Sequence, residues 1–341
     1  MKDTQKQLLE FCSITGVPGL EQNAVHYAAN ILKEYGDTRI SSLGSLICTV
    51  QKPVVGKPHI MLDAHIDEIG MIVTYINEKG FLKVASCGGV DRRLLLSSQV
   101  TVHTQEKDLV GIICSIPPHL QTDTSKNNPK IEDIYIDIGF DQETAQKLVR
   151  IGDRITINDT PMVLLNDYIC SAAIDDRAGC VAIMLAVKQL KKENLVGGLS
   201  VVFSTMEEVG GMGAKTAAYE LNPTHAIAVD VGFGDMPDVE EFKSCKVNSG
   251  PAIAHAPILC KQMSKKLEEV AKAKNIPFQL EAMGGRTGTN ADGIATSRCG
   301  VKTAILSIPQ RYMHTTVEVV ATQDVENTAK LIAEYVKEVL K

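Results

Sequence analysis

Hydrophobic positions follow a helical period near the start of the chain and a strand period through its second quarter. Residues 4–35 place apolar side chains at helical spacing, with a break around Gly16–Gly19. Between about residues 69 and 162, short β-rich segments such as MIVTYI and LVGIICSI alternate with Gly, Asp or Asn. This region is therefore predicted to form a compact β-domain, with one helix at 142–149 and a polar loop at 121–133.

After residue 163 the pattern alternates between strands and helices. Strands are predicted at 59–62, 199–205, 225–232 and 301–308, and helices at 177–192, 214–219, 257–274 and 322–341. Such alternation is typical of a mainly parallel sheet with helices on both faces. The predicted fold class is thus α/β. One catalytic-type domain of residues 1–68 and 163–341 is interrupted by an inserted β-rich domain of residues 69–162.

Composition narrows the class of protein. The 341 residues suffice for two domains, and 44% apolar with 22% charged residues is ordinary for a soluble globular enzyme. A net charge of −6 disfavours nucleic acid and anionic membranes as partners. The longest apolar run is shorter than the roughly 20 residues that span a bilayer, and the N-terminus shows no signal-peptide core. Nine isolated cysteines without a C-x-x-C pair fit a reducing cytoplasm, where we expect the protein.

Acidic and imidazole side chains stand at the ends of the apolar runs, where ligands bind in an open α/β sheet. They are His65 and Asp67, Asp175 and Asp176, Glu207 and Glu208, Asp230, and His314. Each motif alone has an ordinary structural explanation, such as a helix cap, a turn or a surface pair. Adjacent glutamates at a buried strand end, however, repel each other unless a cation is present. Five such motifs together favour a shared site, and the other six histidines lack comparable acidic partners.

Two histidines, two aspartates and one glutamate form a mixed nitrogen and oxygen ligand set that suits zinc, cobalt or manganese. Two divalent ions about 3.5–4 Å apart can share a carboxylate, polarise an amide carbonyl and lower the pKa of a bridging water. The remaining glutamate is then predicted to act as general base toward that water. Asp67 lies on the same side of an extended segment as His65 and can accept its second N–H.

With these residues placed, the sequence resembles the TET-type aminopeptidases of metallopeptidase family 42, relatives of glutamyl aminopeptidase that include proteins labelled "cellulase M". The resemblance covers nearly the whole chain. It rests on D-A-H-I-D-E at 63–68, A-I-D-D-R-A-G at 173–179, M-E-E-V-G at 206–210, V-D-V at 229–231 and R-Y-M-H at 311–314.

The resemblance implies a role for each site residue. Asp175 bridges two metal ions, His65 and Asp230 complete one metal site, and Glu208 and His314 complete the other. Glu207 corresponds to the general base, and Asp67 to the carboxylate that orients His65. A cis peptide bond is expected between Asp175 and Asp176.

The resemblance also implies partners. The inserted domain is similar to a PDZ-like dimerisation domain, and the expected assembly is a tetrahedral dodecamer built from dimers. The expected substrates are peptides with a free N-terminus, without nucleic acid or membrane partners.

Two positions depart from the family pattern, and both bear on side-chain preference. Gly288-Thr289-Asn290-Ala291 stands where the family usually has G-T-D-A, and Thr315-Thr316 stands where many members have Ser-Pro. Neither change removes a predicted ligand. Acidic-specific, leucine-type and basic-specific members share the motifs, so the sequence leaves the preferred N-terminal residue open, as it does the native metal.

Alternative functions explain less of the sequence. A carboxypeptidase or aminoacylase of the same clan shares the order H-x-D, D, E-E, D, H, but the Asp-Asp-Arg-Ala-Gly signature and the β-rich insert favour the aminopeptidase. A glycosidase needs two carboxylates and no metal, which leaves both histidines unexplained. Its sugar-stacking cleft is also disfavoured by 4% aromatic residues and no tryptophan. A decayed scaffold is disfavoured because every predicted ligand and the base are present.

Overall fold

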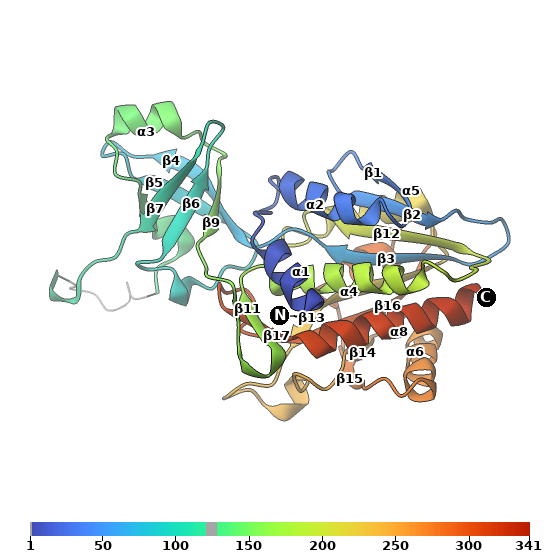
Figure 1. The fold of residues 1–341 in the computed structure, drawn as a ribbon. Coiled ribbons are helices and arrows are strands. Elements are labelled where there is room, and N and C mark those ends of the chain that lie inside the picture. Colours follow the sequence, from blue (N-terminus) through green and yellow to red (C-terminus); the bar gives the residue numbers. More distant parts are fainter. Residues whose placement is uncertain (1, 121–127) are drawn as a thin grey trace.

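The computed structural model describes residues 2–120 and 128–341, which form a helix-flanked eleven-stranded sheet beside a closed six-stranded barrel (Figure 1). The sheet has the order β1 (Asp37–Ile40), β2 (Leu46–Gln51), β12 (Gly198–Ser204), β3 (His59–His65), β13 (His225–Phe233), β16 (Lys302–Arg311), β17 (Glu318–Ala321), β11 (Tyr168–Ser171) and β10 (Met162–Val163). Two further strands, β14 (Ala252–His255) and β15 (Gln279–Ala282), branch from β16. The fold is therefore mixed α/β.

The sheet is parallel only at its centre, so the prediction of a mainly parallel sheet is wrong for its flanks. Strands β12, β3, β13 and β16 are parallel neighbours. On one side β2 and β1 pair antiparallel, and on the other β17, β11 and β10 do so. Several of these outer strands join their partners through short connections without a crossover helix, which imposes antiparallel pairing. Their short length also kept most of them from being predicted.

The central strands are buried on both faces, and successive side chains enter two different cores. Along β3, Ile60, Leu62 and Ala64 pack into the larger core and Met61 into the smaller one. The larger core is closed by α1 (Asp3–Cys12), α2 (Gln22–Leu32), α4 (Ile174–Leu190), α6 (Lys261–Ala273) and α8 (Thr322–Leu340). The smaller one is closed by α5 (Met212–Leu221) and α7 (Ala291–Ala295). By the same alternation, Asp63 and His65 share the face of Met61.

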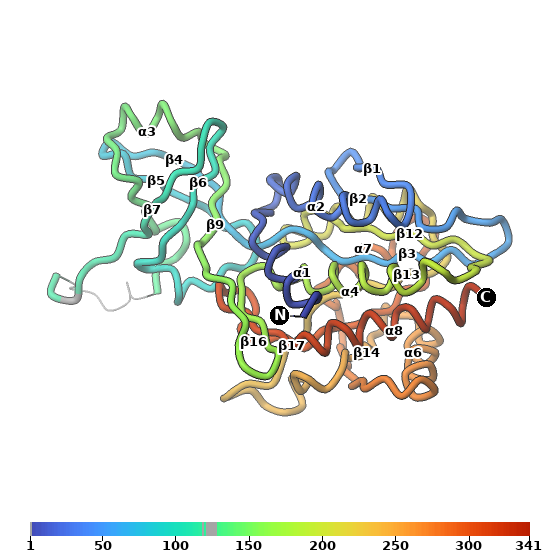
Figure 2. The backbone as a smooth tube through the Cα atoms, viewed as in Figure 1, coloured from blue at the N-terminus to red at the C-terminus, as the bar shows by residue number. Residues whose placement is uncertain are grey.

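The barrel has a hydrophobic core of its own, separate from those of the sheet. Its strands are β4 (Gly70–Ile76), β5 (Leu82–Cys87), β8 (Tyr135–Asp137), β7 (Asp108–Ile113), β6 (Gln99–His103) and β9 (Arg154–Ile157), in closed order. The chain enters the barrel after β3 and returns to the sheet after β9 (Figure 2). The predicted helix is present as α3 (Gln142–Leu148). Of the predicted polar loop, residues 121–127 lie outside the described part of the chain.

The predicted helices are present with shifted ends. The first one is two helices, α1 and α2, separated at the predicted glycine break. Helix α4 begins three residues before Arg177, and α6 begins four residues after Pro257. None of the helices in the described ranges is both long and apolar enough to cross a bilayer.

Candidate metal centre

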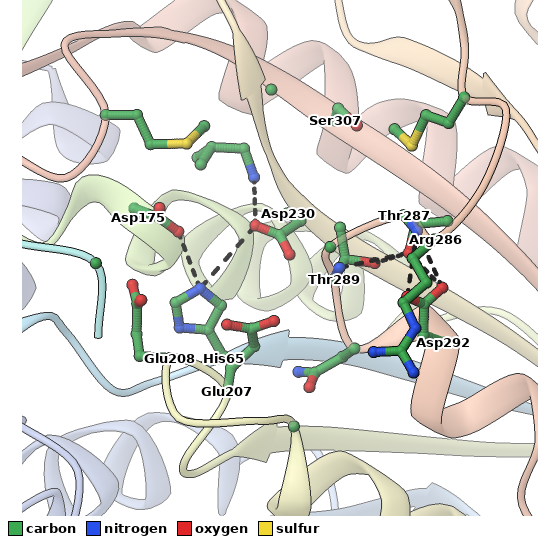
Figure 3. Close-up of a pocket in the computed structure, with 18 of the residues that line it drawn as sticks. His65, Asp175, Glu207, Glu208, Asp230, Arg286, Thr287, Thr289, Asp292 and Ser307 are labelled. Carbon is green, nitrogen blue, oxygen red and sulfur yellow. Dashed lines mark hydrogen bonds and ion pairs between the residues drawn. The ribbon is translucent and has the colours of Figure 1, made fainter. Parts of the chain in front are cut away.

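The predicted site residues meet in one cavity of about 540 Å³ at the carboxyl ends of the central strands (Figure 3). His65 ends β3, and Asp230 lies near the end of β13. Glu207 and Glu208 follow β12, Asp175 stands at the start of α4, and His314 follows β16. All six line the cavity. Parallel strands place their carboxyl ends along one edge of a sheet, which is why residues so distant in sequence converge.

Two groups of possible ligands share one carboxylate. His65 Nε2 lies 2.9 Å from Asp175 Oδ1 and 4.0 Å from Asp230 Oδ1. His314 Nε2 lies 3.4 Å from Asp175 Oδ2 and 3.6 Å from Glu208 Oε1. Within each group, one ligand atom per residue lies within 4.8 Å of the others. Across residues 2–120 and 128–341 these are the two groups found with metal-site geometry, and together they contain all five predicted ligands.

The pKa values of the acids in the cavity are strongly shifted. Burial raises the pKa values of Glu208 and Asp230 well above normal, and neighbouring carboxylates add to the effect. Burial also favours protonation of Asp175, but contacts with His314 and His65 outweigh it and hold its pKa below the usual range. Several buried carboxylates around two imidazoles carry more negative charge than the imidazoles can balance. The donor set therefore fits divalent cations, which would compensate that charge.

Asp67 supports the turn that carries both glutamates. Its Oδ1 accepts the Glu207 backbone N–H at 3.0 Å, and its Oδ2 accepts that of Glu208 at 3.1 Å. His65 Nδ1 lies 3.6 Å from the Asp67 carboxylate but 3.0 Å from the Asp67 carbonyl oxygen. The residue thus contacts the imidazole mainly through its backbone, while its side chain fixes Glu207 and Glu208 relative to His65.

Glu318 supports the opposite side of the site and was not predicted. It lies on β17, is 1% exposed, and its Oε2 accepts the Asp175 N–H at 3.1 Å. Its Oε1 accepts the His314 N–H at 2.8 Å. A single acid preceding the apolar run Val319–Ala321 was the available signal. Glu318 thus holds the backbone of two members of the second ligand group, Asp175 and His314.

The barrel segment also reaches the site. The carbonyl oxygen of Gly89, which follows β5, lies 3.0 Å from His314 Nδ1. Preceding it, Gly88 has φ +85°, and a Cβ at that position would lie 2.9 Å from Glu208 Oε2. The position thus favours glycine both for its backbone conformation and for its contact with Glu208.

The start of α4 is anchored by residues that do not line the cavity of the candidate site. The peptide bond between Asp175 and Asp176 is cis, as predicted, and Asp176 Oδ1 accepts the Gly179 N–H at 3.0 Å. Arg177 is fully buried, donates to the carbonyl oxygens of Phe11 and Ile14, and lies 3.5 Å from Glu68 Oε1. The Asp-Asp-Arg signature therefore ties the shared carboxylate to the segment after α1.

Comparison with known proteins identifies this combination of fold and site. The family model described as M42 glutamyl aminopeptidase matches residues 44–331. The chain belongs to the M42 aminopeptidase family. It is accordingly a hydrolase of peptide bonds, a TET-type metal-dependent enzyme that acts at peptide N-termini.

Individual M42 relatives match over nearly their full length. A putative aminopeptidase of Acetivibrio thermocellus is 37% identical, with 96% of each chain covered. The lysyl aminopeptidase of Pyrococcus furiosus is 32% identical, with 93% of this chain and 92% of the relative covered. Among solved structures, the Pyrococcus horikoshii TET1 peptidase, described as assembling into a tetrahedron or a large octahedral shell, has a TM-score of 0.85. It is 31% identical, covering 97% of this chain and 98% of its own.

Proposed function

We propose that this M42 aminopeptidase holds two divalent metal ions, one in each ligand group, with Asp175 shared between them. His65 and Asp230 would complete one site, and Glu208 and His314 the other. The observation that carries the proposal is that Asp175 has an imidazole near each of its oxygens and that each group contains one further acid. Zinc and cobalt suit this ligand set best, and manganese also accepts it.

Bound ions of this kind polarise a peptide carbonyl and lower the pKa of water. The chain itself supplies the proton transfers through Glu207, whose carboxylate lies in the same cavity but in neither ligand group. Burial raises the pKa of Glu207, which brings it closer to the range useful for exchanging protons near neutrality. Glu207 accepts a proton from the attacking water and returns it to the leaving amine. Asp67 keeps Glu207 in place because its carboxylate accepts the Glu207 backbone N–H.

Action at the N-terminus is supported by the family match, since the relatives that align with nearly the whole chain are named as aminopeptidases. The same match argues against a carboxypeptidase. A glycosidase would leave His65 and His314 without a role.

The parts beyond the cavity are proposed to serve assembly. We assign residues 1–68 and 163–341 to the catalytic domain and residues 69–162 to a PDZ-like dimerisation domain. This proposal is supported by the separate barrel core and by exposed apolar side chains on the barrel, including Val110 and Ile151. The tetrahedral or octahedral shell described for the Pyrococcus horikoshii TET1 peptidase and the dodecamer described for PhTET1-12s support a large assembly. For this chain we propose a dodecamer built from dimers. Unpaired cysteines fit the cytoplasm.

A pair of otherwise identical peptides tests the exopeptidase proposal. We expect the metal-loaded enzyme to shorten a peptide from its free N-terminus, one residue at a time, because the free α-amino group is part of recognition. The N-acetylated form of the same peptide should remain intact, and mass spectrometry of the time course distinguishes the two. Equal cleavage of the acetylated peptide, or removal of its C-terminal residue, would instead support the aminoacylase or carboxypeptidase alternative.

A further inference from the structure

A carboxylate outside both ligand groups lines the same cavity. Glu281, on β15, is largely buried, and its Oε1 accepts the Ser307 hydroxyl hydrogen. No lysine or arginine nitrogen in the described ranges lies within ion-pair distance of it. Its other oxygen, Oε2, accepts no hydrogen bond within the described ranges and is not fully buried. A buried acid with one free oxygen and no cationic partner is costly unless a ligand supplies the positive charge.

The strand register places this acid beside the metal centre. Ser307 is the direct neighbour of Asp230 in the β13–β16 ladder, and Ala252 is the neighbour of Ser307 on β14. Glu281 pairs with Ala254, two residues along β14 and therefore on the same face. The two small alanines leave space for the Glu281 side chain to cross β14 to Ser307. In Figure 3, Ser307 lies on the side of Asp230 away from His65.

The approach to Glu281 is kept open by a glycine. Gly232 lies two residues after Asp230, and a Cβ there would lie 2.9 Å from Ser307 Cβ and 3.5 Å from Glu281 Oε2. Any larger residue would therefore fill the space between Asp230 and Glu281. The cavity thus extends from the ligand groups to a carboxylate that bonds to Ser307, the strand neighbour of Asp230.

Two other charged side chains, Asp292 and Arg286, line the cavity on the side of Glu281, and together they leave the net charge of this side negative. Asp292 lines it and accepts hydrogen bonds from Thr287. Arg286 also lines it, but its side chain is exposed, on the loop that Figure 3 shows beside Thr287 and Asp292. Two carboxylates, those of Glu281 and Asp292, therefore share this wall with one exposed guanidinium.

We infer that Glu281 is a specificity-determining residue that binds the cationic side chain of an N-terminal lysine or arginine. The inference rests on the proposed function, because the α-amino group must first be held at the metal-loaded ligand groups. From there, a long flexible side chain runs past Gly232, and its terminal cation reaches Oε2. An aspartyl or glutamyl side chain in the same place meets a buried like charge.

The test compares aminoacyl p-nitroanilides that differ in charge but little in length. We expect the metal-loaded, full-length enzyme to hydrolyse lysyl and arginyl substrates with higher kcat/KM than the norleucyl substrate, and the glutamyl substrate most slowly. Glu281→Gln keeps the shape of the side chain but removes its charge. It should lower the ratio of lysyl to norleucyl kcat/KM by about 10- to 100-fold, chiefly through KM, as expected for losing a hydrogen bond to a charged group.

Arg286→Gln is the matched control, since it removes a charge from the same wall, and its lysyl to norleucyl ratio should not fall. Wild-type enzyme gives a second measurement, in which free L-lysine should inhibit more strongly than free L-norleucine. Hydrolysis of the norleucyl substrate without a lysyl preference, or an unchanged ratio in Glu281→Gln, would overturn the assignment of Glu281 alone. No release from any anilide would overturn the proposed aminopeptidase function with it.

Discussion

Glu207→Gln is expected to lower kcat for peptide hydrolysis by about 10²- to 10⁴-fold, because the amide cannot accept the proton of the attacking water. KM should change far less, since Glu207 belongs to neither ligand group. Steady-state kinetics on an aminoacyl p-nitroanilide measure both constants. The metal content per subunit, measured by elemental mass spectrometry, should equal that of the wild type.

The control for this variant is Glu220→Gln, which changes the same functional group on the exposed face of α5, where Glu220 pairs with Arg39. We expect it to retain wild-type kinetics, since surface pairs of this kind contribute little. A Glu207→Gln enzyme that keeps full metal content and near-normal kcat would show that another group moves the proton. Loss of metal from that variant would instead make Glu207 a ligand.

Asp175→Ala is expected to abolish metal binding at both positions, whereas Asp230→Ala should abolish it at one. The difference follows from geometry, because Asp175 belongs to both ligand groups and Asp230 to only one. After dialysis against limiting zinc, elemental analysis should give about two ions per subunit for wild type, about one for Asp230→Ala and close to none for Asp175→Ala. Hydrolysis should be lost in Asp175→Ala.

If both variants lost the same amount of metal, binding of an ion by Asp175, Glu208 and His314 would depend on Asp230, which lies outside that group. Retention of one ion in Asp175→Ala would mean that the carboxylate is not shared. Thermal unfolding of each chelated variant should accompany the metal count. Burial raises the pKa of Asp230, so metal-free Asp230→Ala should be no less stable than metal-free wild type. Metal-free Asp175→Ala loses the contacts with His65 and His314 that lower the pKa of Asp175, so it should be less stable.

The grouping of the candidate ligands could be predicted from sequence because each of them stands at the end of an apolar run. Strand ends are visible in a hydrophobic pattern, and the parallel centre of the sheet brings those ends to one edge. The residues that hold the ligands in place were harder to predict. Glu318 lies on a four-residue strand, β17, and Gly89 contributes only a carbonyl oxygen. Backbone contacts leave no side-chain signature.

Asn290, which stands where the family usually has aspartate, makes buried hydrogen bonds that the motif alone does not reveal. The Asn290 side-chain amide donates to Asp63 Oδ2 at 2.9 Å and to Ser204 Oγ at 2.8 Å. Burial raises the pKa of Asp63 to about 7, even with these two hydrogen bonds. An aspartate at position 290 would place a second acid against Asp63 in a buried setting. Asn290 therefore donates to a buried acid that an aspartate at this position would repel, a contact that neither motif reveals alone.

The most direct test of the account is to remove the metal and restore it in measured amounts. The enzyme is stripped with a chelator, titrated with zinc or cobalt, and followed by release of N-terminal residues together with bound metal per subunit. We predict no hydrolysis by the stripped enzyme and full recovery as occupancy approaches two ions per subunit. Full activity in enzyme shown to contain no metal, or saturation at one ion, would contradict the proposed two-ion centre.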